Sequence, residues 1–264
     1  MANSFQLYQP GDSFLYLADP RTKVIAVLVT FALSVLFSSP FILGPVLILV
    51  VSLDLAGGIP PRRILKLMQG LAVLAAISVV MWPLFFKHGE PLFQLGPFLV
   101  TDLGVGFGVA MACRILIMIL ASTTLMYCTP QRDLVLGLNR LGLPYKASFA
   151  FATAFRFLPT MIGVGQTILE AQRARGLELE KGGLMKRLKS YGAIMAPVII
   201  ESIRVAHQLA LSVEVRGFDA RPHRTSLREL TYSTGDRLAL VAMAILIVSA
   251  IITRSLGYGV IAAN

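Results

Sequence analysis

Hydrophobic positions along the chain form long, nearly continuous runs that are separated by short polar stretches. These runs cover residues 24–56, 67–86, 104–127 and 238–252. A transmembrane helix needs about 20 mostly apolar residues, so the last three runs each predict one span, the final one somewhat short. The first run is longer and is interrupted at Ser38-Ser39-Pro40 and at Pro45, which predicts two short helices joined by a tight hairpin. The pattern predicts about five transmembrane helices.

Between residues 129 and 235 the pattern changes, because apolar and basic residues alternate in blocks. In 159–175 and 191–213, apolar residues recur every three or four positions, which predicts two long amphipathic helices. Helices of this kind lie along the membrane surface or bridge to a partner. We therefore expect an all-α polytopic membrane protein. It would have an N-terminal transmembrane domain (1–128, about four spans), an inserted cytoplasmic domain (129–235) and a C-terminal transmembrane helix (236–264).

Positive charge suggests the orientation of these segments. Arg62, Arg63 and Lys66 follow the hairpin, and further basic residues are concentrated in 173–228. Positively charged loops stay on the cytoplasmic side of a membrane, so we expect these segments and the N-terminus to be cytoplasmic. The stretch 87–102 has few basic residues and is expected to be an external loop.

Composition supports a membrane protein. The 264 residues are 56% hydrophobic and 14% charged, whereas soluble domains carry about 25% charged residues. The net charge of +10 comes from clusters between the apolar runs, an arrangement that fits loops at an anionic lipid surface better than a nucleic-acid-binding face. Cys113 and Cys128 have no metal-ligand spacing, so neither a metal site nor a disulfide is expected.

Two amphipathic stretches end in the same way, with an arginine followed by a glycine. A glycine just past a helix end adopts the left-handed conformation that closes the last turn, and a basic residue there complements the helix dipole. This local explanation suffices for either ending alone. The residues concerned are Ala174, Arg175 and Gly176, and then Val215, Arg216 and Gly217.

Two such endings on successive helices favour a shared role in binding a partner. A guanidinium on a stiff helix end presents five donors in a planar fork to the carboxylates of an acidic groove. Glu178 and Asp219 follow their arginines by three residues. These acids would hold the guanidinium in place or pair with basic residues of the partner.

Catalytic signatures are missing from the sequence. It contains no phosphate-binding Gly-x4-Gly-Lys-Ser/Thr loop, no His-Glu-x-x-His pair and no Gly-x-Ser-x-Gly turn. His88, His207 and His223 are far apart in sequence. We therefore expect a membrane subunit that is not an enzyme, holds no cofactor, and is driven by a separate motor.

Two further arginines have open alternatives. Arg114 lies inside the fourth predicted span, where a charge is costly and usually faces the protein interior. It would serve either a substrate path or, more simply, an ion pair or hydrogen bonds to loop carbonyls. Arg156 is close to Pro159, where a kink is expected, and is either a boundary arginine that reaches to the lipid headgroups or part of a hinge.

Several motifs resemble the transmembrane T component of energy-coupling factor (ECF) transporters, the EcfT/CbiQ family. The resemblance covers nearly the whole chain, and its most specific part is the pair of Arg-Gly motifs at this separation. Val215 stands where the family often has alanine. The motifs are LADPRTK (17–23), CRILIMILASTTLMYCTP (113–130), LNRLGLPYK (138–146), AFRFLP (154–159), EAQRARG (170–176) and EVRGFDA (214–220).

This resemblance implies an importer of vitamins or transition-metal ions in a prokaryotic plasma membrane. In such importers, two cytoplasmic ABC-type ATPases bind ATP and dock on the T component, while a small membrane S component captures the substrate. Arg175 would contact one ATPase and Arg216 the other, and the residues beside them would pack closely at the helix ends. The apolar faces of the same helices, from about Met161 and from Tyr191, would bear on the S component, so 129–235 would be a coupling domain.

Two alternatives remain. A pore-lining permease subunit of a conventional ABC importer would have one coupling helix per chain, whereas this chain has two Arg-Gly helix ends. A membrane enzyme or a transporter without a motor would have clustered carboxylates or histidines inside the spans, and the spans contain almost none.

Overall fold

The computed structural model describes residues 11, 13–85, 91–95, 98–177, 183–218, 230–257 and 259. Backbone contacts divide the chain into two compact units. We call Met1–Leu143 with Leu230–Asn264 the bundle unit, and Pro144–Glu229 the helix-pair unit. The elements are α1 (Phe14–Leu17), α2 (Pro20–Leu36), α3 (Pro40–Ala56), α4 (Pro61–Phe85), β1 (Pro91–Leu95), β2 (Phe98–Thr101), α5 (Asp102–Cys128), α6 (Gln131–Arg140), α7 (Tyr145–Ala174), α8 (Leu184–Val215) and α9 (Thr234–Ser255).

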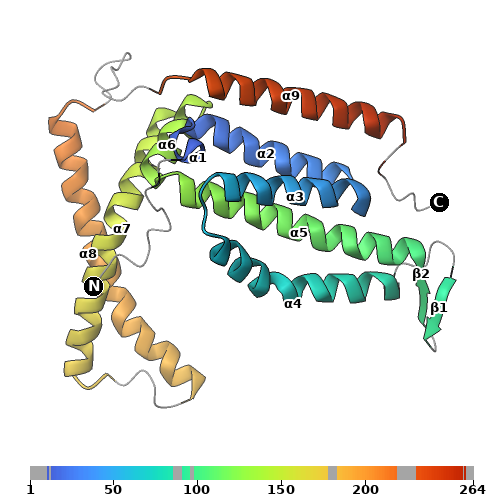
Figure 1. The fold of residues 1–264 in the computed structure, drawn as a ribbon. Helices are drawn as coiled ribbons and strands as arrows, with labels where there is room; N and C mark the ends of the chain where they lie inside the picture. Colours follow the sequence, from blue (N-terminus) through green and yellow to red (C-terminus); the bar gives the residue numbers. More distant parts are fainter. Residues whose placement is uncertain are drawn as a thin grey trace. The chain divides into compact units, whose positions relative to one another are not determined.

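The bundle unit is organised around α5. This helix packs against α2, α3 and α4, while α9 and α6 pack against α2 (Figure 1). Leu43 of α3 and Ile117 of α5 are fully buried at its centre. A side chain at Gly108 would lie 3.3 Å from the backbone of Ser78 and Val79, so this glycine lets α4 approach α5 closely.

The helix starts explain where the spans begin. Asp19 precedes Pro20 and accepts a hydrogen bond from the Arg21 backbone N–H at 2.8 Å, which caps α2. The hairpin after α2 is confirmed, because α3 starts at Pro40, whereas Pro45, the second expected interruption, lies inside α3. α9 begins four residues before the predicted run, because Ser233 and Asp236 form a reciprocal capping box that starts the helix within a polar sequence.

Five helices are long and apolar enough to cross a membrane: α4, α5, α7, α9 and Ser190–Val215 of α8. The number agrees with the sequence prediction, but its members differ. α2 and α3 have 17 residues each, about 26 Å of helix, which is the lower limit for a span. α7 and α8 were assigned to the cytoplasmic domain, and that assignment stays a prediction. The chain is a multi-pass, helical membrane protein.

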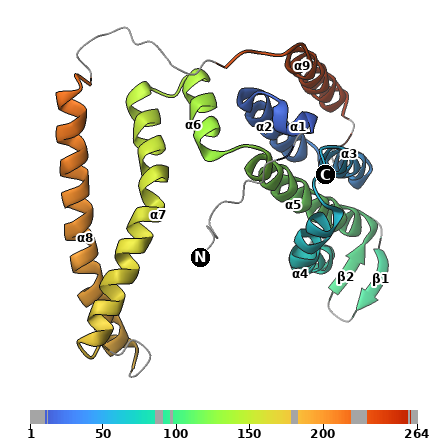
Figure 2. The same cartoon turned by 60° about the vertical axis from the view of Figure 1, so that its left-hand side comes forward.

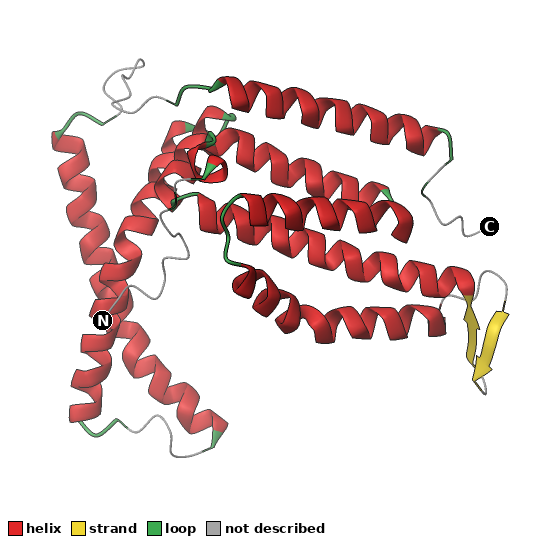
Figure 3. Ribbon diagram, viewed as in Figure 1, coloured by secondary structure: helices red, strands yellow, loops and turns green. Residues whose placement is uncertain are grey.

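Helices make up nearly all of the described structure, but a β-hairpin joins α4 to α5 (Figure 3). β1 and β2 pair antiparallel, with an irregular register between Pro91 and Phe93. The sequence predicts only a loop there, because the short apolar strands give no signal that separates them from the ends of the neighbouring apolar runs.

Candidate interaction site

The end of α7 closes in a defined hydrogen-bonded geometry around Arg175 and Gly176. Gly176 has φ +84°. Its backbone N–H donates to the Arg173 carbonyl at 3.0 Å, and the Leu177 N–H donates to the Gln172 carbonyl at 3.0 Å. These two bonds form a Schellman motif, which satisfies carbonyls that the helix leaves unpaired.

The end of α8 repeats this geometry around Arg216 and Gly217. Gly217 has φ +69° and donates its N–H to the Glu214 carbonyl at 2.8 Å, while the Phe218 N–H donates to the Val213 carbonyl at 3.1 Å. The two predicted Arg-Gly endings therefore share one backbone structure, with the arginine at the C-cap each time.

The closure alone does not make these ends special. Gly58 after α3 and Gly142 after α6 also have positive φ and bond in the same pattern. The distinguishing feature is an arginine at the C-cap, where α3 has Gly57 and α6 has Leu141. Arg175 and Arg216 are both exposed, and within the described part of the chain neither guanidinium has an ion-pair partner.

The residues next to these arginines are open to a partner as well. Ala174 is exposed, and Val215 exposes 89% of its surface. Nothing lies within 4 Å of the position that a side chain at Gly176 would take. Glu178 and Asp219, the acids expected to hold the guanidinium groups, lie outside the described residues.

α7 and α8 lie side by side and run antiparallel (Figure 2). The amide of Gln172 donates to the Ala193 carbonyl at 3.3 Å near the end of α7. At the opposite end, the ring of Phe218 lies 4.7 Å from that of Phe149 and 5.8 Å from that of Tyr145, measured between ring centres. As the residue number rises in α7, the number of its neighbour in α8 falls.

This register places the two Arg-Gly ends at opposite ends of the helix pair. Phe149 is level with Phe218, and Arg175 lies 26 residues further along (175 − 149). At 1.5 Å per residue, the two arginines are separated by about 39 Å along the pair. They therefore cannot enter one groove together.

An open groove runs between the middles of the two helices, and exposed apolar side chains surround it. Ile199, Ile200 and Ile203 of α8 each expose more than half of their surface. The contact with α7 therefore leaves part of the apolar stripe of α8 uncovered. The groove is lined by Pro159, Thr160, Gly163, Val164, Thr167, Ile168, Pro197, Ile200, Glu201 and Arg204.

Arg114 is bonded to backbone carbonyls. Its Nε donates to the Ser34 carbonyl at 2.6 Å and its Nη2 to the Phe37 carbonyl at 2.7 Å. Both carbonyls belong to the end of α2, where no further turn supplies N–H donors. These are the hydrogen bonds of the structural alternative, and a substrate path past Arg114 stays a hypothesis.

Arg156 and Pro159 are both exposed on α7. The guanidinium of Arg156 lies 5.0 Å from the centre of the neighbouring Phe157 ring. Pro159 lies within the helix, which continues through it. Neither the boundary role nor the hinge role of Arg156 is tested by this arrangement.

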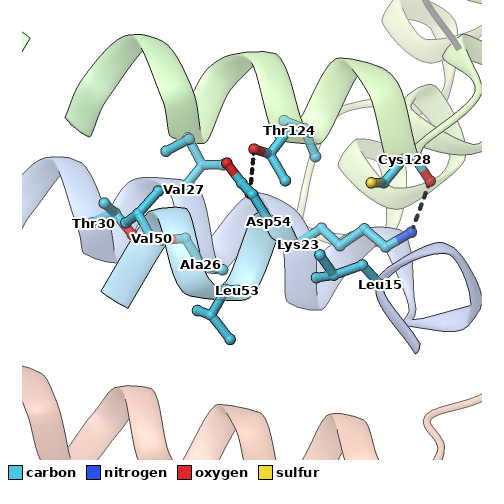
Figure 4. A pocket seen from close by; sticks show the side chains of 12 residues that line it. Leu15, Lys23, Ala26, Val27, Thr30, Val50, Leu53, Asp54, Thr124 and Cys128 are labelled. Carbon is cyan, nitrogen blue, oxygen red and sulfur yellow. Dashed lines mark hydrogen bonds between the residues drawn. The ribbon is translucent and has the colours of Figure 1, made fainter. Parts of the chain in front are cut away.

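Asp54, for which the sequence predicts no role, is a buried carboxylate near the end of α3. It is 2% exposed, and its Oδ1 accepts a hydrogen bond from the Thr124 hydroxyl at 2.7 Å. Figure 4 shows Asp54 and Lys23 in the same mainly apolar pocket. Lys23 points away from Asp54 and donates to the Cys128 carbonyl at 3.0 Å. Among the described residues, no group of three acidic, histidine or cysteine side chains is placed to hold a metal ion.

Fold and site together define a multi-pass helical membrane protein with a helix pair that carries an exposed arginine at each end. The chain matches the cobalt transport protein family CbiQ over residues 11–227. It is 30% identical to the energy-coupling factor transporter transmembrane protein EcfT of Listeria innocua over 247 residues, which is 90% of this chain and 93% of that protein.

Similar values relate it to the EcfT of Brevibacillus brevis, at 32% identity over 91% of this chain and 94% of that protein. A putative ABC transporter ATP-binding protein of Bifidobacterium longum is 30% identical over 92% of this chain, but the match covers only 32% of that protein. The chain belongs to the EcfT/CbiQ family of energy-coupling factor transporter transmembrane proteins. Its partners are therefore of the ABC transporter type.

Proposed function

We propose that this chain is the coupling subunit of an ECF-type ABC importer, in which it passes ATP-driven motion of two cytoplasmic ATPases to a substrate-binding S component. The substrate would be a vitamin or a transition-metal ion. The observation that carries this proposal is the repetition of one Arg-Gly helix closure at opposite ends of a single antiparallel helix pair.

The separation of the two ends supports two ATPases rather than one. A single groove cannot receive two arginines about 39 Å apart along a helix pair. Each arginine sits at the C-cap, where the closed backbone fixes the direction of its Cα–Cβ bond. Two copies of an acidic groove, one on each nucleotide-binding subunit, would match two equivalent guanidinium groups.

The middle of the helix pair supplies a surface for the S component. The apolar side chains around its groove are uncovered in this chain alone, and a small membrane protein would cover them from within the bilayer. Movement of the helix ends would then shift this surface, provided that the complex has two arrangements that the nucleotide favours differently.

The coupling subunit itself would hydrolyse nothing and bind no cofactor, because ATP would be held by the partner subunits. The relative from Bifidobacterium longum supports a close link between the two activities. That relative is named as a putative ABC transporter ATP-binding protein, and this chain matches only part of it. We place the protein in a prokaryotic plasma membrane, with the N-terminus and the coupling domain in the cytoplasm.

A pore-lining permease of a conventional ABC importer is the alternative function. Membership of the EcfT/CbiQ family does not favour it. The paired Arg-Gly ends also argue against it, because such a permease needs one coupling helix per chain.

Charge reversal at the helix ends tests the proposal. We expect Arg175→Glu and Arg216→Glu each to reduce co-purification of the ATPases with the tagged chain, because an anion would face an acidic groove. Arg140→Glu is the matched control, since Arg140 is also an exposed arginine just before a Schellman closure, at the end of α6. Full ATPase recovery with both Arg175→Glu and Arg216→Glu would refute the proposal.

A further inference from the structure

The start of α2 contacts the element through which the chain enters the helix-pair unit. That element is α6, which ends three residues before Leu143. A side chain at Gly137 of α6 would lie 3.1 Å from Cβ of Pro20 and 3.5 Å from the backbone nitrogen of Arg21. The missing side chain therefore lets α6 press directly against the first turn of α2.

The start of α2 also holds the segment through which the chain leaves the helix-pair unit. Nη2 of Arg21 donates to the Leu230 carbonyl at 3.3 Å, and the guanidinium lies 4.9 Å from the centre of the Tyr232 ring. The backbone N–H of Asp19 donates to Oδ1 of Asp236 at 3.0 Å. Leu230 is the first residue of the bundle unit after the helix-pair unit. Arg21 therefore binds the connecting segment at the residue where the chain re-enters the bundle unit.

Charged groups are unusually buried at this place. Asp19, Lys23 and Asp236 each expose less than a tenth of their surface. Lys23 ties the cluster to the end of α5 through the Cys128 carbonyl. Buried ionic groups do not by themselves make a bundle more stable than apolar residues would. Their concentration where both connections meet α2 indicates that they fix a position.

We propose that the start of α2 (Asp19, Pro20, Arg21 and Lys23), here called the anchor, fixes both connections of the helix-pair unit so that displacement of α7 and α8 reaches α2 and α9. Arg21 is the main positioning residue. This inference rests on the proposed coupling function. A displacement passes through a connection only if the connection is held. Without Arg21, the Leu230–Tyr232 segment would change its backbone dihedral angles when α7 and α8 move. The displacement would then not reach α2 and α9.

The test compares how the two units respond to nucleotide. The full complex with its ATPases is placed in lipid nanodiscs, and amide hydrogen exchange is measured with and without the ATP analogue AMP-PNP. In the wild type, we expect nucleotide to change exchange in α7 and α8 and also in α2 and α9. In Arg21→Ala, we expect α7 and α8 to respond as before, while most of the response of α2 and α9 is lost.

A direct local effect should accompany this loss. The Ser233 amide, which donates to Oδ2 of Asp236 at 2.9 Å, should exchange about tenfold faster in Arg21→Ala, because the segment before it loses the hydrogen bond that the Leu230 carbonyl accepts from a charged donor. Arg21→Lys keeps the charge but not the planar fork and should restore part of the response. Tyr232→Ala should weaken the response, whereas Tyr232→Phe should keep it because the ring remains.

Arg254→Ala is the matched control. Arg254 of α9 also donates to a backbone carbonyl of α2, that of Leu36. This hydrogen bond joins the same two helices, but at the ends that lie away from Asp19 and Asp236. We expect its loss to leave the nucleotide response of α2 and α9 intact. An equal loss in Arg21→Ala and Arg254→Ala would overturn the proposal, because it would reveal only general loosening of the bundle.

Two other results would also overturn it. One is an unchanged response of α2 and α9 in both Arg21→Ala and Tyr232→Ala. The other is a wild-type complex in which nucleotide affects α7 and α8 alone. Failure of the proposed function is a different result, in which the wild-type chain retains no ATPases and neither unit responds to nucleotide. That result would also refute the proposed role of the anchor in transmitting movement.

Discussion

Replacing Gly176 by alanine tests whether the backbone closure, and not only the arginine, prepares the end of α7 for binding. Gly176 has φ +84°, and nothing lies within 4 Å of the new methyl group. The substitution therefore acts through the backbone alone. A left-handed conformation costs a residue with a side chain about 1–2 kcal/mol, which corresponds to roughly a 5- to 30-fold change in an equilibrium constant.

If the ATPase binds only the closed end, its dissociation constant should rise by up to this factor. The assay is titration of the purified ATPases onto the chain in nanodiscs, with binding followed by interferometry. Gly176→Asn should have a smaller effect, because asparagine tolerates the left-handed region better than alanine does. Amides at the end of α7 should lose protection in Gly176→Ala in parallel with the loss of affinity.

Gly165→Ala is the control for this experiment. It makes the same chemical change in the same helix, and nothing lies within 4 Å of the added methyl group there either. Gly165 is inside α7, where alanine should stabilise the helix by about 0.5–1 kcal/mol. The reasoning is refuted if Gly176→Ala binds the ATPases as tightly as the wild type while its last turn stays protected.

Three further substitutions test the bundle unit, each by the free energy of unfolding measured by denaturant titration in detergent. Gly108→Val should destabilise the bundle by about 1–3 kcal/mol, because its side chain would meet the α4 backbone at 3.3 Å; a stability equal to that of the wild type would contradict the close α4–α5 contact. Arg114→Ala should lower the free energy of unfolding by about 2 kcal/mol or more, because it leaves the Ser34 and Phe37 carbonyls unpaired. Unchanged stability together with a loss of transport would instead support a substrate path past Arg114. Thr124→Val should cost about 1 kcal/mol or more by removing the hydroxyl donor to Asp54, whereas Thr124→Ser should retain most of the stability, and equal losses in both would show that this hydrogen bond is unimportant.

Local signals allowed much of the fold to be predicted. Asp19 before Pro20 and the proline at position 40 mark helix starts by chemistry that needs no distant partner. The Arg-Gly pairs likewise mark helix ends, because a glycine with positive φ closes the last turn within five residues. These features depend on neighbours in sequence, and so a single sequence reveals them.

Contacts between distant residues could not be predicted in this way. Nothing in the sequence near Arg21 indicates that its guanidinium meets Leu230, 209 residues further on. The burial of Asp54 against Thr124 depends in the same way on how α3 packs against α5. The antiparallel register of α7 and α8, which separates the two arginines, rests on pairs such as Gln172 with Ala193 that only the folded structure brings together.

The antiparallel register also makes the helix pair a molecular ruler. Its length, and not the flexibility of any loop, determines the spacing between Arg175 and Arg216. Removal of seven residues from each helix would bring the two arginines about 10 Å closer, and motor subunits with a fixed spacing could no longer engage both. In the proposed complex, changes in the length of α7 and α8 during evolution would therefore be matched by changes in the distance between the two ATPase grooves.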